Sequence, residues 1–122
     1  ALHSLGLEAS YHTCGGTVGI EELIVQNGCD VSETLAPPSV GGNQEPWEFK
    51  KKVGDRLALI GGVDQFNVVT RGSEKAIREK VFELFEKVGQ GGGYICSLSD
   101  HFFDTPPDNL DAFARAAREC VY

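Results

Sequence analysis

The sequence predicts an α/β protein with a parallel sheet, either a doubly wound domain or a stretch of a (β/α)8 barrel. Three observations lead to this fold class. Short β-branched and apolar runs alternate four times with segments of 3.6-residue apolar spacing. Stretches rich in glycine and proline separate these runs. The length of 122 residues lies in the range of a single domain, although four strand–helix units do not close an eight-stranded barrel.

The first strand–helix unit begins with a strand over residues 8–12. A helix follows, and its shared apolar face holds Ile20, Leu23 and Ile24. Gly28 ends this helix, and the second strand covers residues 30–35. Residues 1–7 resemble the end of a preceding helix, so we expect the chain to begin inside a larger architecture.

The middle of the chain supplies a second and a third helix. A loop rich in proline and glycine, residues 36–43, precedes a short helix in which Pro46 suits the first turn. The third strand is predicted over residues 57–60. Ser73 is a good N-cap for the helix with the clearest periodicity. The apolar positions of that helix are Ile77, Val81, Leu84, Phe85 and Val88.

The fourth unit follows the glycine-rich residues 89–93, which end this helix. The strand over residues 94–98 is mostly apolar, as expected for a strand covered on both faces. The last helix starts after Pro106-Pro107-Asp108. One side of it is lined by Leu110, Phe113, Ala114, Ala117 and Val121. Residues 1–122 are expected to form one unit without an internal domain boundary.

The composition excludes several classes of protein. A net charge of −7, from 18 acidic and 11 basic residues, argues against a nucleic-acid-binding protein. No apolar run reaches the roughly 18 to 20 residues of a membrane-spanning helix. The N-terminus also lacks the pattern of a secretory signal. We therefore expect a cytoplasmic protein that binds neither a membrane nor a nucleic acid.

The cysteines point to a metal site. They are expected to be free thiols, because no secretory signal indicates an oxidising compartment. Cys14 and Cys96 fall at predicted C-terminal strand ends, where α/β proteins bind ligands, and His12 lies two residues before Cys14. One imidazole and two thiolates are a set that selects zinc. The alternative is that both thiols are buried apolar groups and His12 is a hydrogen-bonded core residue.

Two further polar residues lie near predicted strand ends. Asp64 follows a pair of glycines and is either a pocket residue or a loop cap. Arg71 precedes a helix start and is explained most simply by a salt bridge at the helix entry.

Several short motifs occur together along the chain. The first is His12-Thr13-Cys14-Gly15-Gly16. The others, in order, are Gly54-Asp55-Arg56, Gly61-Gly62-Val63-Asp64, Thr70-Arg71-Gly72, Gly91-Gly92-Gly93-Tyr94-Ile95 and Asp104-Thr105-Pro106-Pro107-Asp108-Asn109-Leu110. In order and approximate spacing they resemble the uroporphyrinogen decarboxylase superfamily, and the first motif resembles the HxCG signature of its methylcobamide:thiol methyltransferase branch.

This resemblance implies a fold and an activity. The fold is a (β/α)8 TIM barrel about three times this length, with the present chain as its C-terminal part of about four βα units. The implied zinc ligands are His12, Cys14, Cys96 and, as a fourth ligand that a substrate thiol displaces, Glu33. The implied reaction transfers a methyl group from a methylated corrinoid, carried by a corrinoid protein, to a small-molecule thiol whose pKa zinc lowers.

Two other hypotheses remain open. Uroporphyrinogen decarboxylase itself acts on a tetrapyrrole without a metal, and His101 matches a histidine that faces the substrate in that branch. Asp64 is the second candidate catalytic residue. The joint presence of His12, Cys14 and Cys96 favours the methyltransferase branch. The third hypothesis is a non-catalytic partial barrel that forms a homodimer, because open sheet edges need covering.

Overall fold

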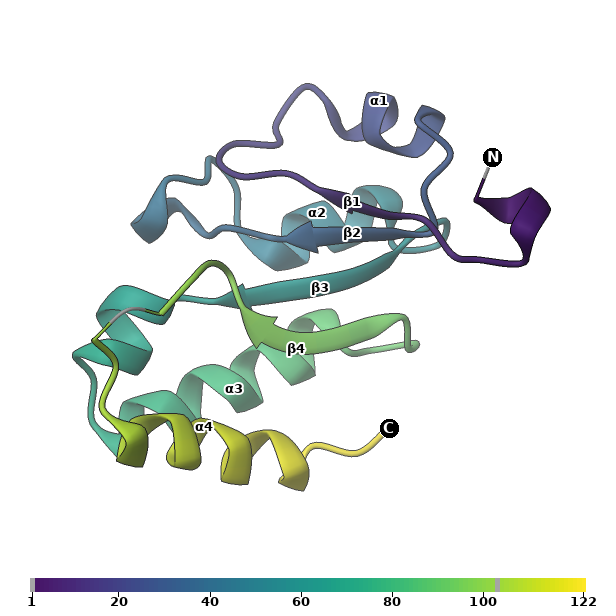
Figure 1. Cartoon of the computed structure of the whole chain (residues 1–122). Coiled ribbons are helices and arrows are strands. Elements are labelled where there is room, and N and C mark those ends of the chain that lie inside the picture. The colour runs from purple at the N-terminus through teal and green to yellow at the C-terminus, as the bar shows by residue number, and fades with distance from the viewer. Residues whose placement is uncertain (1, 103) are drawn as a thin grey trace.

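The computed structural model describes residues 2–102 and 104–122, which form four strand–helix units around one parallel sheet (Figure 1). The strand order is β1-β2-β3-β4. The strands are β1 (Ser10–His12), β2 (Val31–Thr34), β3 (Ala58–Val63) and β4 (Tyr94–Leu98). The helices are α1 (Glu21–Gln26), α2 (Pro46–Val53), α3 (Glu74–Val88) and α4 (Pro107–Glu119). This arrangement confirms the predicted α/β fold as part of a TIM barrel.

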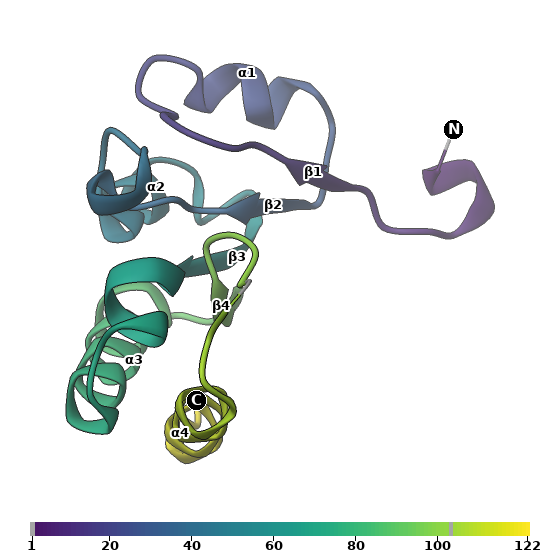
Figure 2. The same ribbon diagram turned by 60° about the vertical axis from the view of Figure 1, so that its left-hand side comes forward.

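The two faces of the sheet have different surroundings. The helices lie along one side of the curved sheet, and the other side is open (Figure 2). Side chains alternate between the faces along each strand. The row that faces the helices holds Tyr11, Ser32, Leu59 and Tyr94. The next row, on the open face, holds His12, Glu33, Ile60 and Ile95, and Ile95 is 56% exposed.

The hydrophobic core lies between the sheet and the helices. Phe49 and Val53 of α2 and Leu59 of β3 are all buried there. The predicted N-cap of α3 is confirmed, because Ser73 Oγ accepts a hydrogen bond from Ala76 N at 3.3 Å. The buried positions of α3 are Ile77, Val81, Leu84 and Val88, as the apolar spacing predicts.

Three helical segments differ from the prediction. Leu23, predicted to share an apolar face with Ile20 and Ile24, is 62% exposed, whereas Ile24 is buried. Val121 is exposed, because α4 ends at Glu119. Residues 2–7 form a single 3-10 turn, His3–Leu5, in place of the end of an α-helix. Residue 1 of that predicted segment lies outside the described residues.

The third strand is longer than the sequence predicts and runs to Val63. Gly61 permits this extension, because a Cβ there would lie 1.8 Å from the Thr34 carbonyl oxygen of β2. Beyond β3, residues Gln65–Thr70 form a π-helical turn capped by Asp64. Among the described residues, no helix has the length and apolar character needed to cross a membrane.

Candidate metal centre

His12, the last residue of β1, lies between Glu33 and Cys14. Its Nδ1 is 2.9 Å from Glu33 Oε1, and its Nε2 is 3.0 Å from Cys14 Sγ. The first contact follows from the strand register, which pairs His12 with Glu33. The second contact arises just beyond the end of β1, where the chain turns and brings Cys14 back to the ring. These side chains are accessible from solvent on the open face.

The backbone around Cys14 is tied to β2. Thr13 N donates to Glu33 O at 2.8 Å, and Thr34 Oγ1 donates to Thr13 O at 3.1 Å. Gly15 has a φ of 83°, a conformation that residues with a side chain rarely adopt. The Gly15 that follows Cys14 therefore allows the turn on which the thiol is presented.

Cys96 lies on the opposite face of the sheet. Ile95 belongs to the row of His12 and Glu33, so the next side chain, that of Cys96, points toward the helices. Cys96 packs against the core, and burial raises the pKa of its thiol to about 11. The predicted set of His12, Cys14 and Cys96 is therefore not brought together.

The other two cysteines are half-buried structural residues. Cys29 Sγ donates to the Ile24 carbonyl oxygen at 3.5 Å, and Cys120 Sγ donates to the Ala116 carbonyl oxygen at 3.6 Å. Burial raises the pKa of both thiols. Their packing agrees with the expectation that neither thiol belongs to the reactive face.

A groove of about 450 Å³ lies at the C-terminal strand ends. Its lining includes His12, Glu33, Ser97, Asp100, His101 and Phe102. Both the backbone N and Nδ1 of His101 lie 2.7 Å from Asp100 Oδ1. These two contacts, with a smaller contribution from nearby His12, hold the pKa of Asp100 below its usual range. In this groove, which we call the strand-end groove, the segment after β4 therefore lies beside His12.

A second cavity, of about 650 Å³, adjoins the strand-end groove and shares Asp100, His101 and Phe102 with it. Its aromatic wall, Phe66 and Phe102, is about half exposed and was not predicted from the sequence. Large apolar side chains just beyond strand ends were the available signal. The Arg71 guanidinium lies 3.9 Å from the centre of the Phe66 ring, a cation–π contact in place of the predicted salt bridge.

Asp64 is buried and acts as a loop cap. Its carboxylate accepts hydrogen bonds from Ser39 Oγ at 2.6 Å and Asn67 Nδ2 at 2.8 Å. It also accepts from the backbone N of Phe66 and Asn67. Burial alone would raise the pKa of Asp64, but these four hydrogen bonds outweigh it and lower the pKa. The sequence left open whether Asp64 is a pocket residue or a loop cap, and these hydrogen bonds support the capping role.

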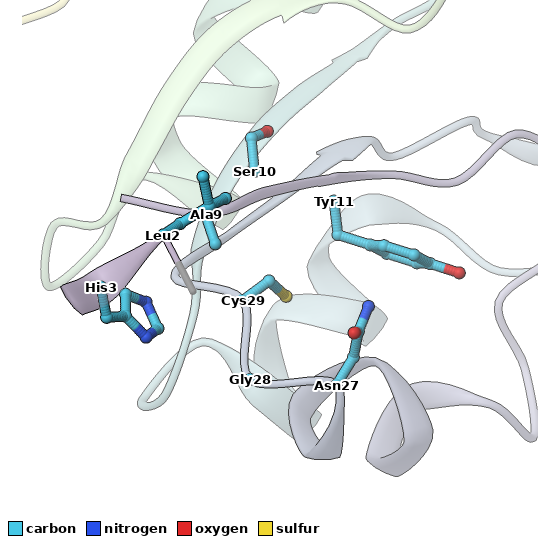
Figure 3. Close-up of a pocket in the computed structure, with 8 residues that line it drawn as sticks. All are labelled: Leu2, His3, Ala9, Ser10, Tyr11, Asn27, Gly28 and Cys29. Carbon is cyan, nitrogen blue, oxygen red and sulfur yellow. The ribbon is translucent and has the colours of Figure 1, made fainter. Parts of the chain in front are cut away.

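A third cavity, of about 540 Å³, lies near the N-terminal ends of β1 and β2 (Figure 3). His3 and Cys29 border it, together with Tyr11 of the edge strand. His3 Nε2 lies 2.7 Å from Asp30 Oδ2, and this contact raises the pKa of His3. Active sites of α/β barrels lie at the other end of the strands. We therefore place the candidate site in the strand-end groove.

The residues of the strand-end groove, together with Cys14, which contacts His12, have the chemistry of a metal site without a preformed metal geometry. Within residues 2–102 and 104–122, no group of three or more His, Cys, Asp or Glu side chains is arranged to hold a metal ion as it stands. The imidazole, thiol and carboxylate groups of His12, Cys14 and Asp100 are nevertheless ligand types that zinc accepts. A metal ion would therefore have to draw the donors together.

Parallel strands that are each followed by a helix, with reactive side chains gathered at their C-terminal ends, define part of an α/β-barrel enzyme scaffold. Residues 1–120 match the family model described as uroporphyrinogen decarboxylase (URO-D), and the chain belongs to that family.

The chain is also similar to two individual proteins. A uroporphyrinogen decarboxylase of Hydrogenovibrio crunogenus is 30% identical over 108 residues, which cover 88% of this chain and 28% of that protein. A solved methyltransferase from Methanosarcina mazei superimposes with a TM-score of 0.76 at 20% identity, covering 97% of this chain and 33% of the other. The chain thus spans about a third of the length of the proteins it matches, and the second match shows a shared fold.

Proposed function

We propose that the chain carries the metal-binding part of an enzyme that transfers a methyl group from a methylated corrinoid to a thiol. The observation that carries this proposal is the position of the His12 ring between Glu33 and Cys14. A decarboxylase that needs no metal has no use for an exposed thiol 3.0 Å from an imidazole nitrogen. The name of the Methanosarcina relative supports the same branch.

The proposed metal is zinc, held by His12 Nε2 and Cys14 Sγ. The two atoms lie 3.0 Å apart, and Cys14 is exposed, so both could reach one metal ion. Glu33 contacts the far nitrogen of the ring and in this proposal orients His12 from behind, as carboxylates commonly do for metal-binding histidines. This role replaces the predicted one of fourth ligand.

The third ligand comes from the segment after β4 in place of Cys96. Asp100 and His101 line the strand-end groove with His12, whereas Cys96 packs on the helix side. A carboxylate oxygen or an imidazole nitrogen completes a catalytic zinc site as readily as a thiolate. Three protein ligands leave one position for the substrate.

In this reaction the thiol would lose its proton, and its sulfur would take the methyl group. The corrinoid would keep the electron pair of the broken bond between cobalt and carbon. A bound zinc ion would lower the pKa of the substrate thiol, so that a thiolate is present near neutral pH. His101, held by Asp100, borders the groove where the thiol would enter. Asp64 fixes the turn that carries Phe66 of the neighbouring cavity.

The second candidate activity is tetrapyrrole decarboxylation. The name of the Hydrogenovibrio relative favours it, and so does the position of His101 in the groove. In this alternative the reaction would need no metal, and the exposed Cys14 would have no chemical part. Dependence on Cys14 therefore separates the two activities.

The test is to incubate the zinc-treated chain with methylcobalamin and 2-mercaptoethanol and to measure the methyl thioether by mass spectrometry. Cys14→Ser should abolish its formation, and the matched control Cys29→Ser, far from the groove, should not. Release of CO2 from uroporphyrinogen without added metal, unaffected by Cys14→Ser, would favour the decarboxylase. Equal formation of the thioether by the parent and by Cys14→Ser would count against the zinc-dependent methyltransferase.

A further inference from the structure

The loop that carries Cys14 is held by a residue from a different strand–helix unit. Asn43, in the connection between β2 and α2, accepts two hydrogen bonds at its Oδ1. The donors are Thr17 N at 2.8 Å and Val18 N at 3.0 Å. Next to it, Gln44 Nε2 donates to Thr17 Oγ1 at 2.7 Å. Three hydrogen bonds thus fasten the β1–α1 loop just beyond Cys14.

Gly16 shows how closely the two loops approach. A Cβ at Gly16 would lie 2.6 Å from the Asn43 side chain, closer than real Cβ contacts come. Gly16 does not have a positive φ, so the backbone itself would accept an alanine. What excludes a side chain there is the amide of Asn43. The residue two positions after Cys14 is therefore packed directly on Asn43.

The connection between β2 and α2 is itself firmly anchored. Gln44 Nε2 also donates to Glu21 Oε1 at 3.2 Å, and Lys52 of α2 pairs with the same carboxylate. Glu21 is buried, and the hydrogen bond from Lys52 lowers the pKa of Glu21 to about 2, so it is ionised at neutral pH. Glu21 Oε2 further accepts from Gly19 N at 2.7 Å. These contacts fix the connection that carries Asn43, so Asn43 can in turn fix the position of the β1–α1 loop.

We infer that Asn43 is a positioning residue for Cys14. It fixes the position of the loop after Cys14 relative to β2. In this position the Cys14 thiol contacts His12. Loss of this hold would leave Cys14 attached to the structure mainly through Thr13 on its other side. The inference rests on the proposed metal site, and it adds a residue that contacts neither metal nor substrate.

The experiment compares zinc affinity, measured by competition with a chromophoric chelator, in three variants. Asn43→Ala should weaken zinc binding by about 10- to 100-fold, the range found for residues that support metal ligands. Asn43→Asp keeps the accepting oxygen and should restore most of the affinity. The matched control is Asn109→Ala. Asn109 also makes two hydrogen bonds to backbone, with Val69 O and Gly72 O, but holds α4 instead of the Cys14 loop.

Two readouts separate positioning from a general loss of stability. Amide hydrogen exchange in the metal-free chain should accelerate at Thr17 and Val18 in Asn43→Ala but not in Asn109→Ala. Gly16→Ala should weaken zinc binding in the parent, because its Cβ displaces the Asn43 amide. It should add no further loss in the Asn43→Ala background.

The outcomes distinguish this inference from the function on which it rests. If the parent binds zinc and Asn43→Ala binds it as tightly as Asn109→Ala does, the inference is overturned and the metal site stands. If the parent binds no zinc, the metal site fails. Faster exchange at Thr17 and Val18 in Asn43→Ala alone would then still support Asn43 as the residue that fixes the Cys14 loop.

Discussion

Glu33 and Cys14 lie on opposite sides of the same imidazole ring, Glu33 at Nδ1 and Cys14 at Nε2 of His12. A ring held this way has one nitrogen directed at the thiol and the other occupied by a carboxylate. The carboxylate fixes the orientation and the tautomer of the ring, which is what a metal-binding histidine needs. Glu33 is therefore expected to matter for metal affinity without touching the metal.

The first prediction concerns Glu33. Glu33→Ala should weaken zinc binding by about 10- to 100-fold, because His12 loses the partner that orients it. Glu33→Gln retains an oxygen that accepts from Nδ1–H and should lose less. Isothermal titration with zinc measures both. Equal affinity of Glu33→Ala and the parent would show that His12 needs no such support.

The second prediction concerns the order in which the thiols react. Burial holds the pKa of Cys96 at about 11, so at pH 8 only about one thiol in a thousand is ionised. Cys14 is exposed to solvent. Iodoacetamide at pH 8 should modify Cys14 well before Cys96, as peptide mass mapping would reveal. Modification of Cys96 first, in the folded chain, would contradict the placement of its side chain.

The third prediction concerns Asp64. Asp64→Asn removes an ionised acceptor from a buried site and places an NH2 group opposite donors. It should lower the free energy of unfolding by about 1–3 kcal/mol. The folded pKa of Asp64 is depressed, so its contribution is present above the unfolded value of about 3.8 and declines as the pH falls further. The parent should therefore lose more stability than the variant between pH 6 and pH 3.

Urea unfolding at both pH values tests this prediction of a capping role. A variant as stable as the parent at pH 6, yet without methyl transfer, would instead support the catalytic role that the sequence left open for Asp64.

Much of the fold was predictable because it depends on local signals. The N-cap at Ser73 and the apolar spacing of α3 are each encoded within a few residues. The neighbourhood of His12 and Glu33 is different, because it depends on the register between two strands 21 residues apart. The presence of both residues at strand ends was predictable, but their contact at Nδ1 was not.

The face of the sheet on which Cys96 lies could not be predicted, for a physical reason. A strand with polar residues on one face reveals which side chains point to the core, but the mostly apolar segment 94–98 gives no such alternation. A shift of one residue along the strand exchanges the faces. The role of Asn43 escaped prediction for a similar reason, since it depends on the approach of two loops 25 or more residues apart in the sequence.

The most direct test of the proposed centre is the zinc content of the purified chain and of three cysteine variants after dialysis against buffer with trace zinc. We expect equal zinc in the parent, Cys96→Ser and the control Cys29→Ser, and none above background in Cys14→Ser. Zinc lost from Cys96→Ser but retained by Cys14→Ser, or absent from the parent, would contradict this expectation.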